Sequence, residues 1–338
     1  MNKDIIQEWL LLSDDFKRNM FNQIALRKKL TEEAVEKDWW VVQTLSLIFS
    51  MDCASALVFK GGTSLSKGWN LIERFSEDID LALDKEYLGF NNETPNKKEV
   101  NVLRRLSYDF IVNTFTTELQ AKFINIGLTN VKVEHQKVQN HDQDPLIVEI
   151  YYPKLTERET YLKPGLLVEI GSRSLKEPFS ARTFQTFVSE GFPQQSFADK
   201  PITIPVVNPE RTFLEKIFLL HEEFQRPAEK KRVERLSRHL YDIEKLMHTD
   251  FAKEAMHNKE LYENIVQHRQ LFAKLGGVDY SKHNPATIKF IPPDDLINLW
   301  EFDYKQMQEN MIYGESLSFS QLIKNLTELQ SEINNIEW

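Results

Sequence analysis

The stretch FKGGTSLSKGWNLIERFSEDIDLAL, residues 59–83, decides the fold of this chain. A short apolar run leads into it and is stopped by Gly61 and Gly62, which predicts a buried strand that ends in a tight turn. Residues 64–72 suit one or two helical turns. The alternating run at 79–84 predicts a second strand. The expected order is strand, glycine turn, short helix, acidic cluster, strand.

The acidic cluster holds three carboxylates, Glu77, Asp78 and Asp80, within four positions. Like charges repel at this spacing, so we expect a positive group beside them. On a strand, Asp78 and Asp80 face the same side, roughly 6.6 Å apart at about 3.3 Å per residue. Such oxygens suit Mg²⁺, which takes other ligands from water and substrate phosphates. The alternative is an ordinary solvated strand end.

Where two metal ions act on one phosphate, a third carboxylate usually helps to hold the second ion. Glu169 is a single acid within the apolar strand candidate LLVEIG, residues 166–171. Glu149 occupies the same kind of position in LIVEIYY, residues 146–152, and competes with it. Both remain candidates on sequence alone, with Glu169 as our first choice.

The glycine turn suggests a site for a triphosphate. Gly61 and Gly62 allow backbone N–H groups to approach phosphates closely. Thr63 and Ser64 add hydroxyl donors, and Lys67 lies one turn into the helix that starts there. A glycine pair that only makes a turn is the alternative.

Composition limits the class of protein. The 338 residues suffice for two domains, and a net charge of −9 argues against a surface coated with nucleic-acid-binding charge. Cys53 is the only cysteine, which excludes a disulfide framework and a cysteine-based zinc site. We find no signal peptide and no apolar run of roughly 20 residues, as a membrane span would need. We expect a cytoplasmic protein.

The character of the chain changes near residue 207. Strand-like stretches at 131–138, 146–152, 166–171 and 202–207 precede it. In contrast, NPERTFLEKIFLL begins with Asn208 as an N-cap and Pro209 at the first helical position. Helical patterns dominate after that point. We therefore predict a mixed α/β domain at 1–207 and a mostly helical domain at 208–338.

The second half supplies a lysine and an aspartate on helices. Lys216 falls on the rim of an apolar stripe, where a snorkelling lysine is the simplest interpretation. Asp242 lies three residues from His239 on a second helix, so the two are neighbours. Residues 226–239 carry six basic side chains against two glutamates. This segment is either a solvated helix start or the electrostatic footprint of RNA or triphosphate.

The ordered combination of glycine turn and acidic pair resembles the DNA polymerase β-like nucleotidyltransferase superfamily. It is most similar to the AbiEii/AbiGii toxin family of abortive-infection and toxin–antitoxin systems. The family's motif has the form GG-T-x-L-x-K followed by R-x-S-x-D-I-D-L. This sequence carries it as Gly61, Gly62, Thr63, Leu65, Lys67, Arg74, Ser76, Asp78, Ile79, Asp80 and Leu81.

The resemblance implies an α+β fold, with a mixed sheet and flanking helices as the nucleotidyltransferase core and a helical C-terminal domain. It implies Mg²⁺, an NTP substrate, an RNA acceptor such as tRNA and a cognate antitoxin. Asp78 and Asp80 would be catalytic and would hold metal with Glu169. Lys216 would contact triphosphate, and Asp242 would position Lys216 or the substrate. A small-molecule nucleotidyltransferase of the antibiotic-modifying kind and a non-catalytic nucleotide-binding module are the alternatives.

Overall fold

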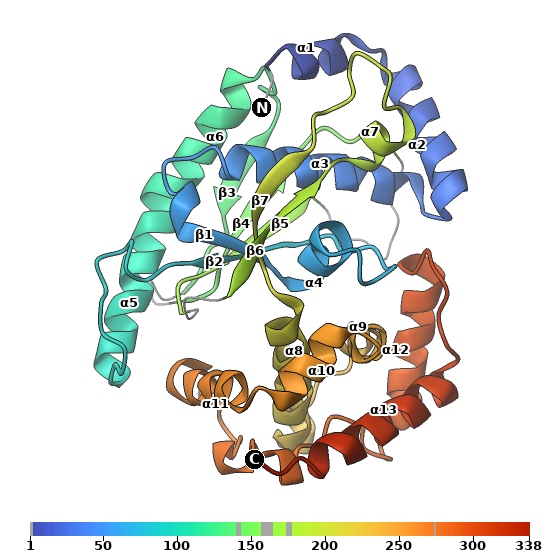
Figure 1. Ribbon diagram of the computed structural model, residues 1–338. Coiled ribbons are helices and arrows are strands. Elements are labelled where there is room, and N and C mark those ends of the chain that lie inside the picture. The colour runs from blue at the N-terminus through green and yellow to red at the C-terminus, as the bar shows by residue number, and fades with distance from the viewer. Residues whose placement is uncertain (1–2, 140–142, 157–164, 174–177, 274) are drawn as a thin grey trace. The chain divides into compact units, whose positions relative to one another are not determined.

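The computed structural model describes residues 3–139, 143–156, 165–173, 178–273 and 275–338 (Figure 1). The chain divides into two compact units. The first comprises Met1–Trp69 and Phe75–Val207, and the second comprises Asn70–Arg74 and Asn208–Trp338. The chain therefore passes between the units at three places, and five residues of the motif segment belong to the C-terminal unit.

A mixed sheet forms the centre of the first unit. Its strands are β1 (Leu57–Lys60), β2 (Ile79–Leu83), β3 (Lys132–His135), β4 (Leu146–Tyr151), β5 (Leu166–Gly171), β6 (Phe179–Phe184) and β7 (Ile202–Val207). Their order across the sheet is β3-β4-β5-β2-β1-β7-β6. The pairs β2–β5 and β1–β7 are parallel and the others are antiparallel. The predicted fold class, a mixed sheet with flanking helices, is confirmed.

Helices supply the rest of the first unit. They are α1 (Lys3–Leu11), α2 (Asp14–Lys28), α3 (Glu32–Ile48), η1 (Ala54–Ala56), α4 (Gly61–Thr63), η2 (Ser64–Gly68), α5 (Lys97–Phe110), η3 (Ile111–Phe115), α6 (Thr116–Asn125) and α7 (Phe187–Gly191). Within the unit, α3 contacts β5, and α6 contacts both β3 and α3 (Figure 1). Thr31 caps α3 by accepting a hydrogen bond from the N–H of Ala34 at 3.2 Å.

Alternation along the strands sets which side chains enter the core. Ile79, Leu81 and Leu83 of β2 are fully buried in the hydrophobic cluster that also holds the inward side chains of α3. Asp80, between the first two, is half-buried on the opposite face of the sheet. The core thus fixes the register of β2, and with it the direction of its carboxylate.

The second unit is helical after its first five residues. Its elements are α8 (Pro209–Gln225), η4 (Ala228–Lys230), α9 (Ser237–Met247), α10 (Asp250–His257), α11 (Lys259–His268), η5 (Arg269–Ala273), η6 (Tyr280–Lys282), η7 (Pro285–Thr287), α12 (Ile297–Asn310) and α13 (Phe319–Asn334). Its core includes the α8 stripe expected from the sequence, with Phe213, Ile217 and Phe218 buried. Within the described ranges, no helix combines the length and apolar composition that crossing a bilayer requires.

Candidate functional site

Gly61 and Asp80 meet where β1 ends. Gly61 adopts φ +79°, a conformation that residues with a side chain rarely take. A Cβ at this position would lie 1.9 Å from Oδ2 of Asp80. The carboxylate therefore occupies the space that only a glycine leaves open. The paired glycines and the D-x-D motif, which lie apart in sequence, are brought together by the antiparallel pairing of β1 with β2.

Glu169 lies beside Asp80 across a strand pair. The two residues are in register on the neighbouring parallel strands β2 and β5. Paired residues of neighbouring strands project to the same face, so both carboxylates stand on the face opposite the core. Asp78 precedes β2 by one residue and is buried. The structure therefore brings together Asp80, Glu169 and the Gly61 turn, with Asp78 adjoining them along the chain.

Glu149 occupies a different place on the sheet. It pairs with Leu167 of β5 and with Glu134 of β3, so the whole of β5 separates its strand from β2. Its carboxylate accepts a hydrogen bond of 2.6 Å from the hydroxyl of Tyr151. Register with Asp80 therefore favours Glu169 over Glu149 as the third acid.

The acidic pair fits Mg²⁺ that completes its coordination elsewhere. No three side chains of His, Cys, Asp and Glu in the described part of the chain are gathered as a ready metal site. Asp80 and Glu169 offer two carboxylates in register instead. Mg²⁺ is commonly held by one or two carboxylates together with water and substrate phosphates, so this donor set suits it.

The hydroxyls of the glycine turn are engaged within the protein. Thr63 donates to the backbone carbonyl of Asp78, and Ser64 donates to that of Gly61 at 2.9 Å. Donation by these hydroxyls to phosphates stays a prediction. Thr63 ties the turn to the D-x-D motif, and Ser64 closes the turn on itself.

Helix α3 supplies one cation, Lys37, and one anion, Asp38, to the motif segment. Lys37 donates to Glu77 at 2.7 Å, and both side chains are about 1% exposed. Lys37 is a positive group beside the acidic cluster that the sequence reasoning did not identify. Burial lowers its pKa, and Glu77 opposes that shift. Asp78 also opposes the lowering of the Lys37 pKa, so Lys37 interacts with two acids of the cluster.

Lys67 is held by the same helix. Its ammonium lies 2.7 Å from the buried carboxylate of Asp38 and 3.9 Å from the ring centre of Phe187. A lysine buried in this way anchors η2 to α3. This engagement gives Lys67 a structural partner, and its contact with phosphate stays a prediction.

Lys60 is a residue that the sequence reasoning missed. It is the last residue of β1 and pairs in register with Asp80. The sheet thus carries a row of Lys60, Asp80 and Glu169 across three neighbouring strands on one face. The sequence signal that could have identified Lys60 is its position directly before the glycine pair.

A buried ion cluster lies in the second unit. The Asp242 carboxylate, fully buried on α9, accepts two 2.7 Å hydrogen bonds from Arg74 and lies 2.8 Å from the Lys216 ammonium. Burial alone would raise the pKa of Asp242, but Arg74 and Lys216 hold it well below its usual range. Lys216 is buried and paired with Asp242, which excludes the snorkelling interpretation. The sequence predicted Lys216 and Asp242 as site residues but missed Arg74, although Arg74 stands in the motif.

His239 is buried beside this cluster. Burial, with Lys216 and Arg238 nearby, holds its pKa well below the ordinary value, so its imidazole is neutral at pH 7. Because its imidazole is neutral, His239 adds no positive charge beside Arg74, Lys216 and Asp242.

The basic segment 226–239 is partly structural. Arg226 and Arg232 both bind the buried carboxylate of Glu223, at 3.0 and 2.9 Å. The backbone N–H of Arg235 donates to Asp303 at 2.6 Å. Lys230 is exposed and Lys231 half-exposed. Two of the six basic side chains thus stabilise the unit itself.

Comparison with known proteins identifies the family. The family model described as "Nucleotidyl transferase AbiEii toxin, Type IV TA system" matches residues 49–325, about four-fifths of the chain. A search of curated proteins finds no match. The matched region includes the glycine turn, the acidic pair and the Arg74–Asp242–Lys216 cluster. The resemblance seen in the motif is confirmed: this chain belongs to the AbiEii family of nucleotidyl transferase toxins of type IV toxin–antitoxin systems and is a nucleotidyltransferase.

Proposed function

We propose that this enzyme transfers a nucleoside monophosphate from an NTP to an RNA acceptor such as tRNA, with Mg²⁺ held by Asp78, Asp80 and Glu169. The observation that carries the proposal is the register of Asp80 with Glu169, together with the Asp80 carboxylate lying against Gly61. Carboxylates beside a backbone that phosphates can approach closely are what nucleotidyl transfer needs.

In this proposal the acceptor hydroxyl attacks the α-phosphorus in line, an oxygen–phosphorus bond forms and pyrophosphate leaves. Bound Mg²⁺ would lower the pKa of the acceptor hydroxyl and offset charge on the phosphates. Asp80 and Glu169 hold their carboxylates on one face of a rigid sheet. One of the site carboxylates accepts the proton of the hydroxyl. The backbone at Gly61 and Gly62 receives the triphosphate.

The second unit is proposed to contribute Lys216 as a phosphate ligand. Its ammonium lies 2.8 Å from Asp242, which the Arg74 guanidinium also binds, and two cations at one place suit contact with an anionic phosphate group. Asp242 is a positioning residue because it holds Lys216, and Arg74 in turn holds Asp242. Lys216→Ala should weaken NTP binding about tenfold in calorimetry. Lys245→Ala, which removes a less buried lysine of α9, is the control and should leave the affinity unchanged.

The family assignment suggests a biological role and a partner for this enzyme. A type IV toxin–antitoxin assignment implies a cognate antitoxin, and we propose a cytoplasmic toxin that modifies RNA. Exposed Lys230 and half-exposed Lys231 are the candidate RNA contacts within 226–239.

The test is incubation of the protein with each labelled NTP, Mg²⁺ and total RNA. Label should move to RNA with wild-type protein, and Asp80→Asn should abolish the transfer while circular dichroism shows an intact fold. The substitution removes metal-binding charge but little volume. Transfer retained by both Asp78→Asn and Asp80→Asn would refute the metal assignment. Label found only on small molecules would favour the antibiotic-modifying alternative.

A further inference from the structure

Lys60 and Asp80 stand directly opposite each other on the antiparallel strands β1 and β2. Side chains opposite each other in such a pair have Cβ atoms about 4.5–5.5 Å apart. Phe59 and Leu81, the neighbouring pair, are fully buried in the core, so alternation puts Lys60 and Asp80 on the other face of the sheet. The lysine therefore flanks this carboxylate on the face where the acids proposed for nucleotidyl transfer stand.

Negative charge exceeds positive charge along this row of side chains. Asp80 and Glu169 are in register on β2 and β5, and neighbouring strands lie only about 4.8 Å apart. Two carboxylates at this spacing repel each other. Lys60, Asp80 and Glu169 are all half-buried, so water and salt screen their charges only in part. The row supplies one cation for two acids, and Lys60 is placed to offset their repulsion.

Other lysines near the motif have acids of their own. Lys37 lies 2.7 Å from Glu77, Lys67 lies 2.7 Å from Asp38, and these side chains are buried. Lys60 differs from both because it is half-buried and in register with a proposed metal ligand. A lysine ammonium is a compact point charge on a flexible four-carbon stem, so it can lie against carboxylates or give way to another cation.

We propose that Lys60 is a positioning residue: it is the counter-ion of Asp80 and Glu169 when no metal is bound, and it couples metal uptake to the NTP. This inference rests on the proposed function. The Lys60 ammonium competes with a free divalent ion for the two carboxylates. When the ion arrives with a triphosphate, the ammonium gains phosphate oxygens to bind. Lys60 therefore disfavours free metal more than metal that accompanies the substrate.

The experiment measures the affinity of the full chain for Mn²⁺ by electron paramagnetic resonance. Mn²⁺ stands in for Mg²⁺ because carboxylate and water ligands suit both ions. Without NTP, Lys60→Met should bind Mn²⁺ about three- to tenfold more tightly than wild type, because a competing cation is gone. Lys60→Arg keeps the charge and should stay within about twofold of wild type. Damage to the fold would not produce a gain in affinity.

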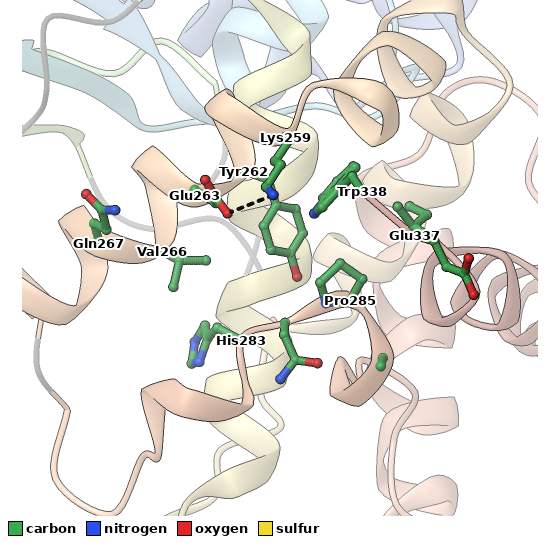
Figure 2. Close-up of a pocket in the computed structure, with 12 residues that line it drawn as sticks. Lys259, Tyr262, Glu263, Val266, Gln267, His283, Pro285, Glu337 and Trp338 are labelled. Carbon is green, nitrogen blue, oxygen red and sulfur yellow. Dashed lines mark ion pairs between the residues drawn. The ribbon is translucent and has the colours of Figure 1, made fainter.

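The matched control is Lys259→Met in the helical unit. Lys259 pairs with Glu263 at 3.8 Å on the lining of a cavity of about 690 Å³ (Figure 2). The substitution makes the same chemical change and the same change in net charge, at a carboxylate that has no proposed role in metal binding. It should leave the Mn²⁺ affinity at the wild-type value. An equal gain in both variants would mean that only net charge matters, and would overturn the proposal.

Coupling to the nucleotide is measured by repeating the titrations with a non-hydrolysable NTP analogue. In wild-type protein the analogue should raise the Mn²⁺ affinity. Lys60→Met should reduce that enhancement by about threefold or more, because the ammonium no longer gains phosphate contacts. An enhancement as large in the variant as in wild type would overturn the coupling.

Melting temperatures in EDTA test the counter-ion without any metal. Lys60→Met should melt below wild type, because two acids lose their cation. Adding Asp80→Asn should recover part of that loss, because it removes one of the two acids. Losses that simply add in the double variant would show that Lys60 and Asp80 do not interact, and would overturn the proposal.

Asp80→Asn alone separates this inference from the proposed function. Loss of Mn²⁺ binding in Asp80→Asn, with unchanged affinity in Lys60→Met, would overturn the role of Lys60 and leave the metal assignment standing. Mn²⁺ binding that Asp80→Asn leaves unchanged would overturn the metal assignment. The melting temperatures in EDTA would then decide on the Lys60–Asp80 pair alone.

Discussion

Asp80 leaves no room for a side chain at residue 61, because its carboxylate lies 1.9 Å from where a Cβ of Gly61 would be. This relationship ties the two halves of the motif together more tightly than strand pairing requires. The Asp80 carboxylate can occupy its position only if residue 61 is a glycine. Any chemistry that Asp80 performs therefore depends on Gly61.

Gly61→Ala should therefore be far more damaging than an ordinary glycine substitution. The positive φ costs about 1–2 kcal/mol for a residue with a Cβ, and the clash adds displacement of Asp80. Gly89→Ala is the matched control, since Gly89 has φ +77° with nothing within 4 Å of the added atom. Urea unfolding and RNA labelling should both separate the variants. Equal losses would mean that backbone strain alone matters at residue 61.

Replacing the two candidate third acids one at a time should give opposite results. Glu169→Gln should lower nucleotidyl transfer about 100-fold or more, because it removes a carboxylate in register with Asp80. Glu149→Gln makes the same chemical change on β4 and should leave transfer near the wild-type rate. Initial rates with labelled NTP measure both. A larger loss of transfer for Glu149→Gln would make Glu149, and not Glu169, the third acid.

Asp242→Asn should destabilise the protein by about 3–5 kcal/mol, since it leaves two buried cations without their carboxylate. The control Asp250→Asn breaks an exposed pair with Lys253 at 2.9 Å and should cost at most about 1 kcal/mol. Denaturant midpoints and slopes compare them. A small change in the free energy of unfolding for Asp242→Asn would show that Arg74 and Lys216 remain buried without this carboxylate at little cost.

The stability of the protein should fall as the pH is lowered from about 6.5 to about 4. Burial, with His283 beside it, lowers the pKa of His221 to about 4. The unfolded chain therefore binds a proton in this window that the folded chain does not, and His221 accounts for a loss of up to about 3 kcal/mol. His221→Gln should lose less stability over the same range. Parallel curves for the two proteins would rule out this contribution.

Local patterns predicted much of the fold. The strands near 57–60, 79–83, 146–151, 166–171 and 202–207 follow from apolar runs and alternation. Strand β6 was missed, because Phe179–Phe184 lies at the sheet edge, is largely exposed and has no apolar run. The order of the strands could not be predicted either, since pairing depends on contacts between segments far apart in the chain.

The site was predicted less completely, for the same physical reason. The sequence places Asp78, Asp80 and the glycines within one segment, so their proximity follows from a single hairpin-like pairing. The partners of Glu77 and Lys67 lie on α3, about 30 to 40 positions away, and only packing reveals them. Residue type alone could not separate an acid that binds lysine from acids that stand beside a glycine turn.

Adjacent residues of α9 hold the upstream segment Asn70–Arg74 in the helical unit. The Tyr241 hydroxyl accepts from the N–H of Glu73 at 3.3 Å, and Asp242 binds the guanidinium of Arg74. A fragment that begins at residue 208 would therefore lack part of the C-terminal unit, namely Asn70–Arg74. A fragment starting there would carry an aspartate in its interior with half of its counter-charge missing.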